Sequence, residues 1–136
     1  MEECIFCKIV AGQVPSKKLF ETDKTQALLD AFPAVAGHSL VIPKKHYETL
    51  LDIPEEDLKD AILVAKKVSQ AVVKATNADG FNLVQNNKEA AGQLVKHVHF
   101  HIVPRFKDDG LKLHFPSNQA EEKVLLEMQE KIKKEL

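Results

Sequence analysis

The sequence predicts an α+β domain whose strands form an antiparallel sheet. Several short strand patterns surround one long helical pattern, an order that is typical of α+β folds rather than of alternating βαβ units. The chain has 136 residues, 44% of them hydrophobic, which is enough for one ordinary core. We therefore expect a single domain over residues 1–136.

The N-terminal half is expected to hold a short helix and three strands. Residues 4–13 are rich in apolar side chains and predict one or two helical turns that end near Gly12. Three short segments with strand-like composition follow, and turn-forming residues separate them. These segments are Lys18–Glu21, Thr25–Asp30 and His38–Ile42.

Residues Pro54–Thr76 predict the main helix. Apolar residues recur there at the three- and four-residue spacing of one helical face. Pro54 suits the first turn, and the acidic residues at 55–57 favour the positive end of the helix dipole. The segment from Asn77 to Gly80 is a stop signal, so the helix is expected to end before it.

Two further strands are expected at Phe81–Gln85 and Lys96–Val103, and the second carries the most informative pattern of the chain. His97, His99 and His101 alternate there with apolar residues. Successive side chains of a strand point to opposite faces, so three imidazoles share one face while the other can pack on a core. An imidazole can act as acid, base, nucleophile or metal ligand near neutral pH. The pattern therefore indicates a catalytic or metal site.

The tail from Asn118 onward is also predicted to be helical. Asn118 and Glu121 have the spacing of a capping box. Leu125, Met128 and Ile132 form a single apolar stripe, which leaves the charged residues of this helix on a solvated face.

Four segments within residues 3–105 resemble the histidine triad family of nucleotide hydrolases and transferases. They are Cys4–Val10, Gly37–His46, the group Asn86, Gly92 and Gln93, and the triad with its apolar neighbours at 97–103. The resemblance implies a five-stranded antiparallel sheet with one long helix and a C-terminal helix, usually assembled as a homodimer. Its nucleoside phosphoramidase branch is the most similar.

The resemblance also implies covalent catalysis without a catalytic metal. His99 would attack the α-phosphate of a purine nucleoside 5′-phosphoramidate or a related conjugate and form a nucleotidyl-histidine intermediate. His101 and His38 would stabilise the phosphoryl oxygens. Asn86 and Gln93 would orient the phosphate or the leaving group as uncharged donors.

Recognition of the purine nucleotide is assigned by the same resemblance to the N-terminal half. Asp30 lies where the family's carboxylate accepts hydrogen bonds from the two ribose hydroxyls. Phe6, Ile9, Val14 and Leu28 would form an apolar slot for the purine, although ordinary core packing accounts for apolar residues equally well.

Cys4 and Cys7 are the two cysteines of the chain and form a Cys-x-x-Cys pair. No strand precedes them, which disfavours a thioredoxin-like redox motif. Two thiolates are half of a tetrahedral zinc site. The resemblance to a uridylyltransferase branch of the family implies that His46 and His97 complete a structural zinc site, with no open position for water.

Three other functions stay open. A dinucleoside polyphosphate hydrolase would use the same triad on a different leaving group. A metal hydrolase would hold an activated water at His97, His99 and His101, but no acidic partner lies beside them in the sequence. A nucleotide-binding regulator with weak catalysis is favoured by Leu94, which stands where phosphoramidases often carry a serine. His114 has no assigned role and is expected to be a surface histidine.

The composition argues against several classes of protein. The chain carries 19 basic and 20 acidic residues, so it lacks the basic field of a dedicated nucleic-acid binder. The absence of an apolar run near 18 residues argues against a membrane helix, and no segment indicates secretion. We therefore expect a cytoplasmic protein.

Overall fold

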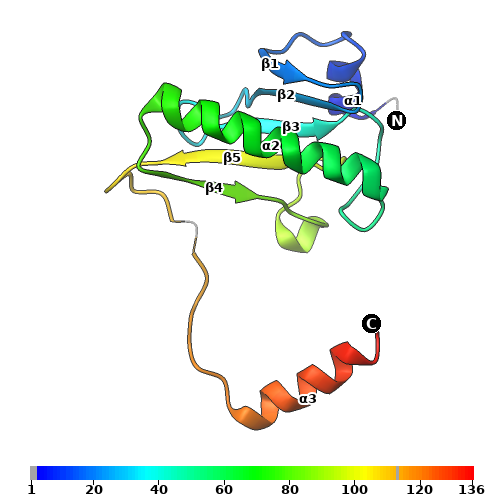
Figure 1. The fold of residues 1–136 in the computed structure, drawn as a ribbon, viewed down its shortest axis with the longest axis vertical. Helices are drawn as coiled ribbons and strands as arrows, with labels where there is room; N and C mark the ends of the chain where they lie inside the picture. Colours follow the sequence, from blue (N-terminus) through cyan, green and yellow to red (C-terminus); the bar gives the residue numbers. More distant parts are fainter. Residues whose placement is uncertain (1–2, 113) are drawn as a thin grey trace.

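The computed structural model describes residues 3–112 and 114–136 and contains an antiparallel sheet in the order β1-β2-β3-β5-β4 (Figure 1). The strands are β1 (Lys18–Glu21), β2 (Thr25–Leu29), β3 (Ser39–Pro43), β4 (Gly80–Val84) and β5 (Phe100–Arg105). The helices are α1 (Ile5–Val10), α2 (Glu55–Thr76), a 3-10 turn at Glu89–Ala91, and α3 (Glu122–Lys133). This arrangement confirms the predicted fold class. Within the described residues, no helix is both long and apolar enough to cross a membrane.

Helix α2 forms where the apolar spacing predicts it. It begins after Pro54, and three acidic residues occupy its first turn, where the helix dipole favours negative charge. Asn77 ends it in the left-handed conformation (φ 55°, ψ 38°) and donates its N–H to the carbonyl of Val73. The buried hydrophobic face of the helix consists of Ala61, Val64, Ala65, Val68 and Val72.

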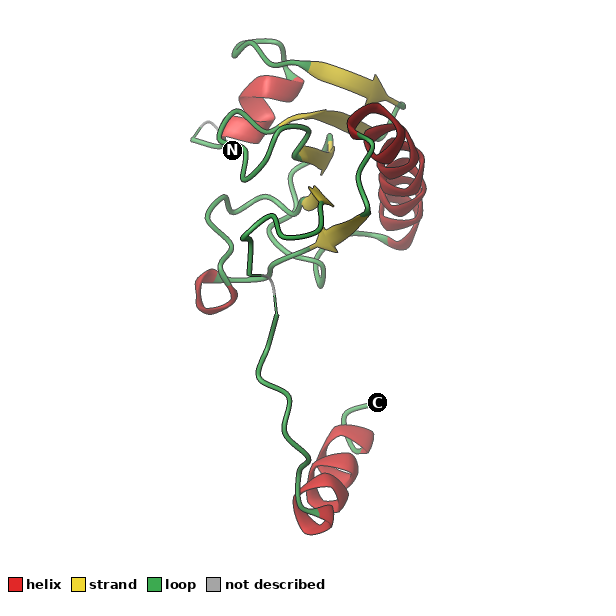
Figure 2. Ribbon diagram, turned by 90° about the vertical axis from the view of Figure 1, so that its left-hand side faces the viewer, coloured by secondary structure: helices red, strands yellow, loops and turns green. Residues whose placement is uncertain are grey.

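The sheet separates two apolar clusters, with α2 on one face and α1 on the other (Figure 2). On the α2 side, Phe100 and Ile102 of β5 pack against the buried face of that helix. On the opposite side, Phe6 of α1 packs against strands β2 and β3. His99 and His101 alternate with Phe100 and Ile102 and face the α1 side, as the strand pattern predicts.

The ends of β1 to β4 lie within one residue of the prediction, but β5 starts four residues and ends two residues later than expected. Its pairing with β3 begins where Phe100 lies opposite Val41. The N–H of Val98 donates instead to the carbonyl of Tyr47, at 2.7 Å, in the turn after β3. The expected strand start at Lys96 is therefore wrong, because the residues before Phe100 bond to a loop.

Helix α3 confirms the predicted helical tail, but the predicted capping box is wrong. The helix begins at Glu122 with Glu121 as its N-cap, and no side chain caps it. Asn118 lies too far upstream, because a capping residue directly precedes the first helical residue. In both views α3 lies apart from the sheet and from α2, and none of its residues is buried (Figures 1 and 2). One domain over residues 1–136 therefore stays a prediction.

Adjacent positions on α2 offer a test of the core. Val64 is 3% exposed and Leu63 is 66% exposed. We expect Val64→Ala to lower the free energy of unfolding by about 2 kcal/mol, because it removes two buried methyl groups and leaves a cavity. Leu63→Ala should change it by less than about 0.5 kcal/mol. Urea denaturation of both variants measures the difference, and equal losses would contradict this packing.

Candidate active site

The three triad histidines take different positions on the α1 side of the sheet. His97 points toward the two cysteines, His101 lies against His38, and His99 lies between these groups. The ring centroids of His99 and His101 are 4.9 Å apart. The alternating pattern therefore supplies two clusters that meet at His99, rather than one row of equivalent imidazoles.

His99 is buried and held in a defined tautomer. Its Nδ1 lies 2.7 Å from the carbonyl oxygen of His97, and a carbonyl only accepts, so Nδ1 carries the proton. The lone pair of His99 is therefore on Nε2, for which no bond is found within the described residues. Phe6 packs edge-on against the ring at a centroid distance of 4.9 Å. Burial lowers the pKa of His99, so the imidazole is neutral and nucleophilic at neutral pH.

His38 and His101 form a hydrogen-bonded pair beside His99. The backbone N–H of Ala34 donates to Nδ1 of His38 at 3.0 Å, which places the proton of His38 on Nε2. That Nε2 lies 3.0 Å from Nδ1 of His101 and donates to it, so His101 carries its own proton on Nε2. The N–H on Nε2 of His101 is therefore the donor with which this pair can bind a substrate.

Both histidines of this pair are neutral at pH 7. Burial, followed by the neighbouring His99 and His38, lowers the pKa of His101 to about 4. Burial also lowers the pKa of His38, and the nearby Asp30 carboxylate opposes that effect. A neutral donor at His101 can bind a phosphoryl oxygen by hydrogen bonding without carrying a permanent charge.

The structure brings together part of the predicted nucleotide site. Asp30 accepts the N–H of Phe32 at 2.8 Å through one oxygen, and its other oxygen lies 3.4 Å from Nε2 of His38. Among the four residues predicted for the purine slot, Phe6, Leu28 and Ile9 share the apolar cluster on the histidine face. The fourth, at position 14, is half-buried and lies outside that cluster.

Gln93 braces a loop in this structure. Its side-chain N–H donates to the carbonyl of Glu48 at 2.6 Å, and its side-chain oxygen accepts the N–H of Lys88 at 2.7 Å. The amide keeps one further N–H for a ligand. Asn86 lies beside Gly92, on the same loop. The predicted contacts of both residues with a phosphate stay predictions.

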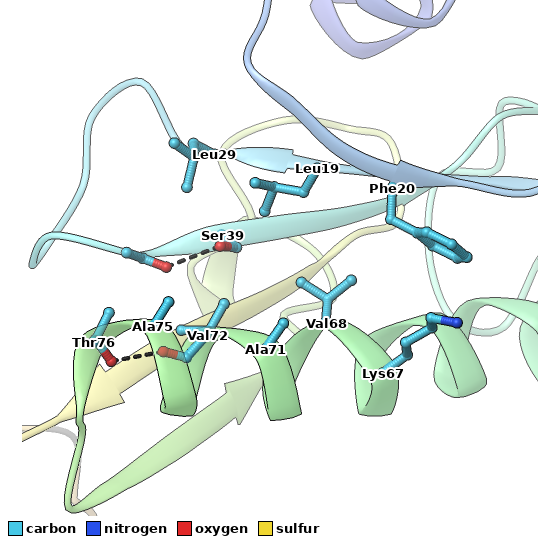
Figure 3. Close-up of a pocket in the computed structure, with 11 residues that line it drawn as sticks. Leu19, Phe20, Leu29, Ser39, Lys67, Val68, Ala71, Val72, Ala75 and Thr76 are labelled. Carbon is cyan, nitrogen blue, oxygen red and sulfur yellow. Dashed lines mark hydrogen bonds between the residues drawn. The ribbon is translucent and has the colours of Figure 1, made fainter.

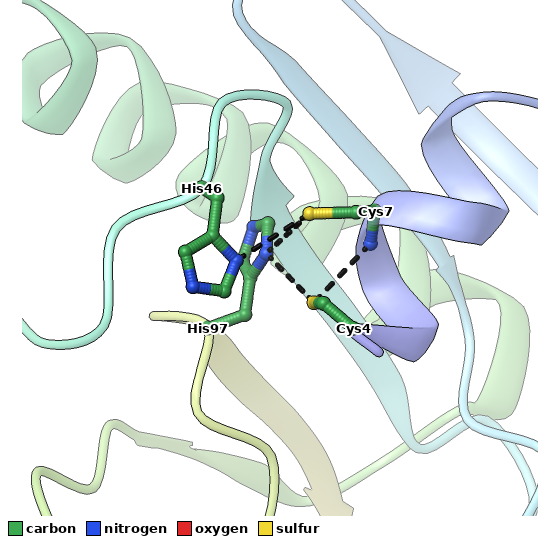
Figure 4. A group of neighbouring side chains, drawn as sticks. All are labelled: Cys4, Cys7, His46 and His97. Carbon is green, nitrogen blue, oxygen red and sulfur yellow. Dashed lines mark hydrogen bonds between the residues drawn. The ribbon is translucent and has the colours of Figure 1, made fainter. Parts of the chain in front are cut away.

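Cys4, Cys7, His46 and His97 converge on one point (Figure 4). The Cys4 Sγ–His97 Nδ1 distance is 3.3 Å, and Cys7 Sγ lies 3.4 Å from His46 Nδ1 and 3.6 Å from His97 Nδ1. In a tetrahedral zinc site, sulfur and nitrogen ligands lie about 3.5 Å apart. The donor atoms therefore have the chemistry and the spacing that zinc requires.

The protonation state of His97 also suits a bound cation. Nε2 of His97 donates to the carbonyl of Pro43 at 2.7 Å, which leaves Nδ1 as the free ligand atom. Burial lowers the pKa of His97 to about 4, so the ring stays neutral. Burial and the neighbouring Cys4 raise the pKa of the Cys7 thiol, and a bound dication would reverse that effect.

Backbone groups orient the rings of His97, His99 and His38, and nothing in the sequence pattern predicted these contacts. The carbonyl of Pro43 fixes His97, the carbonyl of His97 fixes His99, and the N–H of Ala34 fixes His38. Every residue supplies a carbonyl and nearly every residue an N–H, so no residue type signals these contacts. They depend on the path of the chain alone. His114, expected at the surface, is exposed.

Comparisons with known proteins agree with this geometry. Residues 11–108 match the HIT domain family. The chain is 42% identical to an adenosine 5′-monophosphoramidase of Candida albicans, over 98% of this chain and 91% of that protein. A crystal structure from Streptococcus mutans UA159 superposes with a TM-score of 0.95 at 41% identity, covering 99% of this chain and 86% of the other. A zinc-bound histidine triad protein from Mycobacterium smegmatis superposes with a TM-score of 0.78 at 36% identity, covering 86% and 85%.

Titration of His101 tests the buried histidine pair. With a folded-state pKa near 4 and an unfolded value near 6.5, the unfolded chain binds this proton first as the pH falls. The stability contributed by neutral His101 is therefore complete above pH 6.5 and decreases between pH 6.5 and 4. In NMR spectra, its ring signal, assigned by its absence in His101→Asn, should keep the neutral chemical shift at pH 5.5. A protonated ring at that pH contradicts the assignment.

Proposed function

This chain belongs to the histidine triad family, and we propose that it hydrolyses purine nucleoside 5′-phosphoramidates through a nucleotidyl-His99 intermediate. The observation that carries the proposal is the hydrogen bond from His99 Nδ1 to the His97 carbonyl. That bond leaves a lone pair on Nε2 of a neutral ring, beside the N–H donor of His101. The name of the Candida albicans relative supports the choice of a phosphoramidate.

The reaction proceeds in two displacements at the α-phosphorus. The Nε2 lone pair of His99 forms a nitrogen–phosphorus bond while the bond between phosphorus and the leaving amine breaks, and the amine takes a proton from solvent as it leaves. His99 is then cationic, and its Nδ1–H stays bound to the His97 carbonyl. Water attacks phosphorus and gives up a proton to solvent, which breaks the bond to His99, restores its neutral ring and releases the nucleoside monophosphate.

Neighbouring side chains stabilise and position the phosphoryl group in this proposal. His101 donates its Nε2 proton to a phosphoryl oxygen as negative charge develops, and His38 holds the ring of His101 for that task. Asn86 and the remaining N–H of Gln93 orient the phosphate or the leaving group. All these donors are neutral, so they bind the substrate without changing their own charge.

The N-terminal half binds the nucleoside. Asp30 has acceptor capacity left for the ribose hydroxyls after its contacts with Phe32 and His38. The apolar purine slot lies next to it on the histidine face. Its proposed residues are Phe6, Ile9, Val14 and Leu28.

We infer a structural zinc ion at Cys4, Cys7, His46 and His97. The donor set and its spacing support the ion, as does the zinc-bound relative from Mycobacterium smegmatis. With four protein ligands the ion has no position for a reacting water, and its role would be to hold α1 and the turn after β3 to His97. A reduced thiol pair also suits the cytoplasmic location that we propose.

We infer that two copies assemble across the edge strand β4. An exposed strand edge presents unpaired backbone groups that a second strand can satisfy. Phe81 and Leu83 of β4 are exposed there, next to a groove that Ile62 and Val73 of α2 line. A second copy at this edge would cover both the strand and the groove.

Leu94 bears on two alternative functions. It is 93% exposed and has no hydroxyl group to assist a leaving amine. A dinucleoside polyphosphate has a phosphate leaving group that needs less assistance, and a nucleotide-binding regulator needs no turnover at all. Turnover of dinucleoside polyphosphates alone would favour the first, and tight nucleotide binding without any turnover the second.

The nucleophile can be tested with adenosine 5′-phosphoramidate. Intact mass after a quench in base should show a transient gain of one adenylyl group in the parent protein and none in His99→Ala. We expect His99→Ala to lower kcat/KM at least about 10³-fold, because the proposed covalent intermediate forms on His99. His114→Ala, an exposed change outside the site, should keep both the adduct and the rate. Turnover that persists in His99→Ala contradicts the assignment.

Zinc analysis tests the metal cluster separately. Elemental analysis of the purified protein should find one zinc ion per chain and much less in Cys7→Ser, since loss of one of four ligands weakens a structural site. The melting temperature of Cys7→Ser should fall, and it should no longer rise with added zinc. His114→Ala is again the matched control. Equal zinc content in all three proteins would overturn the inferred site.

A further inference from the structure

Helix α3 presents an apolar stripe that none of the described strands or helices covers. Val124, Leu125, Met128 and Ile132 are between 48% and 57% exposed and lie within one arc of the helix. The helix has 12 residues, and isolated helices of that length are only marginally stable in water. A stable α3 therefore needs a surface that covers this stripe.

The start of the C-terminal arm, residues 106–111, is fixed against the edge strand β4. Arg105 donates to both carboxylate oxygens of Asp109, at 2.8 and 3.0 Å, and to Asn82 of β4 at 2.7 Å. Its guanidinium also donates to the carbonyl of Leu111 at 2.7 Å. A bidentate pair of this kind holds one defined geometry. The chain therefore leaves the sheet across β4, in the direction that Figures 1 and 2 show.

The same course of the arm is found in a relative. The superposition with the Streptococcus mutans crystal structure extends over nearly the whole of this chain, and so includes the arm and α3. A TM-score of 0.95 over 99% of this chain requires the helix that matches α3 to lie in a similar place in that chain. An arm held apart from its own domain in this way has its packing partner elsewhere.

A complementary groove lies on the α2 side of the sheet, near the opposite edge (Figure 3). Strands β1 and β2 supply Leu19, Phe20 and Leu29, and α2 supplies one wall. The α2 residues that face the groove include Val68, Ala71, Val72 and Ala75. At one end the ammonium group of Lys67 lies 4.8 Å from the centroid of the Phe20 ring.

The groove and the stripe match in length. Val68 to Ala75 on α2 and Leu125 to Ile132 on α3 span the same number of residues, about 10 Å of helix axis each. Two apolar helix faces of equal length can pack along their full extent. The groove beside β4 is less suitable, because the contact between two copies inferred above would already cover it.

We propose that α3 of each copy packs its apolar stripe into the groove between α2 and strands β1 and β2 of a second copy. The proposal rests on the inferred homodimer but not on the inferred chemistry. Beyond β4, five strands of a second copy would extend for about 24 Å, at about 4.8 Å per strand. Residues 112–121 can span up to about 33 Å when extended, which is enough to reach the far groove.

Paired cysteine substitutions test this exchange in the full-length protein with zinc present. Ala71 lines the groove and Met128 lies on the stripe, and both are exposed in the single chain. In Ala71→Cys/Met128→Cys treated with oxidised glutathione, we expect a disulfide-linked dimer on a denaturing gel. A reductant should convert this dimer back to the monomer. The matched control is Ala71→Cys/Glu130→Cys, because Glu130 is on the opposite face of α3 and its sulfur would point away from the groove.

Each outcome of this experiment decides the proposal. A covalent dimer at least ten times more abundant in the Met128 pair than in the Glu130 pair supports exchange between copies. A monomer whose mass is lower by two hydrogens contains an intramolecular disulfide. That result shows that α3 packs on its own chain and overturns the proposal. Low and equal yields of covalent dimer in both pairs mean that α3 does not pack in this groove, and they also overturn the proposal. Equal melting temperatures of the reduced variants and the parent confirm that each variant is folded.

Discussion

The geometry of the whole site depends on His97, which bonds to both halves of it. Its Nδ1 faces the thiols of Cys4 and Cys7, its Nε2 donates to the carbonyl of Pro43, and its own carbonyl accepts the Nδ1 proton of His99. Any shift of the thiol cluster therefore moves the carbonyl that sets the tautomer of His99. A residue without a reacting atom thus controls the nucleophile through its backbone.

Burial gives the remaining imidazoles their chemical roles. Desolvation is the largest influence on the pKa of His38, His99 and His101 alike, and in each it favours the neutral ring. Neutral rings can be ordered by hydrogen bonds, because each has one donor and one acceptor nitrogen. In the series of hydrogen bonds from Ala34 through His38 to His101, each group donates to the acceptor nitrogen of the next. The last ring therefore presents an N–H next to the lone pair of His99.

Tertiary contact explains the largest error in the strand boundaries predicted from the sequence. The strand expected from Lys96 begins at Phe100, because the turn after β3 takes the N–H of Val98. The bonds of Gln93 to the carbonyl of Glu48 and the N–H of Lys88 were also not foreseen, while its predicted contact with a substrate stays a prediction. Val98 and Gln93 each donate to the loop after β3, which is distant in sequence, and local spacing contains no information about such a partner.

The sequence by itself determined the fold class, the two faces of β5, and the types of residue that gather on the histidine face, because strand periodicity and apolar spacing are local properties. The family resemblance implied that His97 joins the cysteines, but only the tertiary structure gave their distances of 3.3 and 3.6 Å and placed His99 between the two clusters. It also decided which nitrogen of each ring is protonated, and where the chain leaves the sheet after Arg105. Those features depend on carbonyls, N–H groups and side chains far apart in the chain, which become neighbours only when it folds.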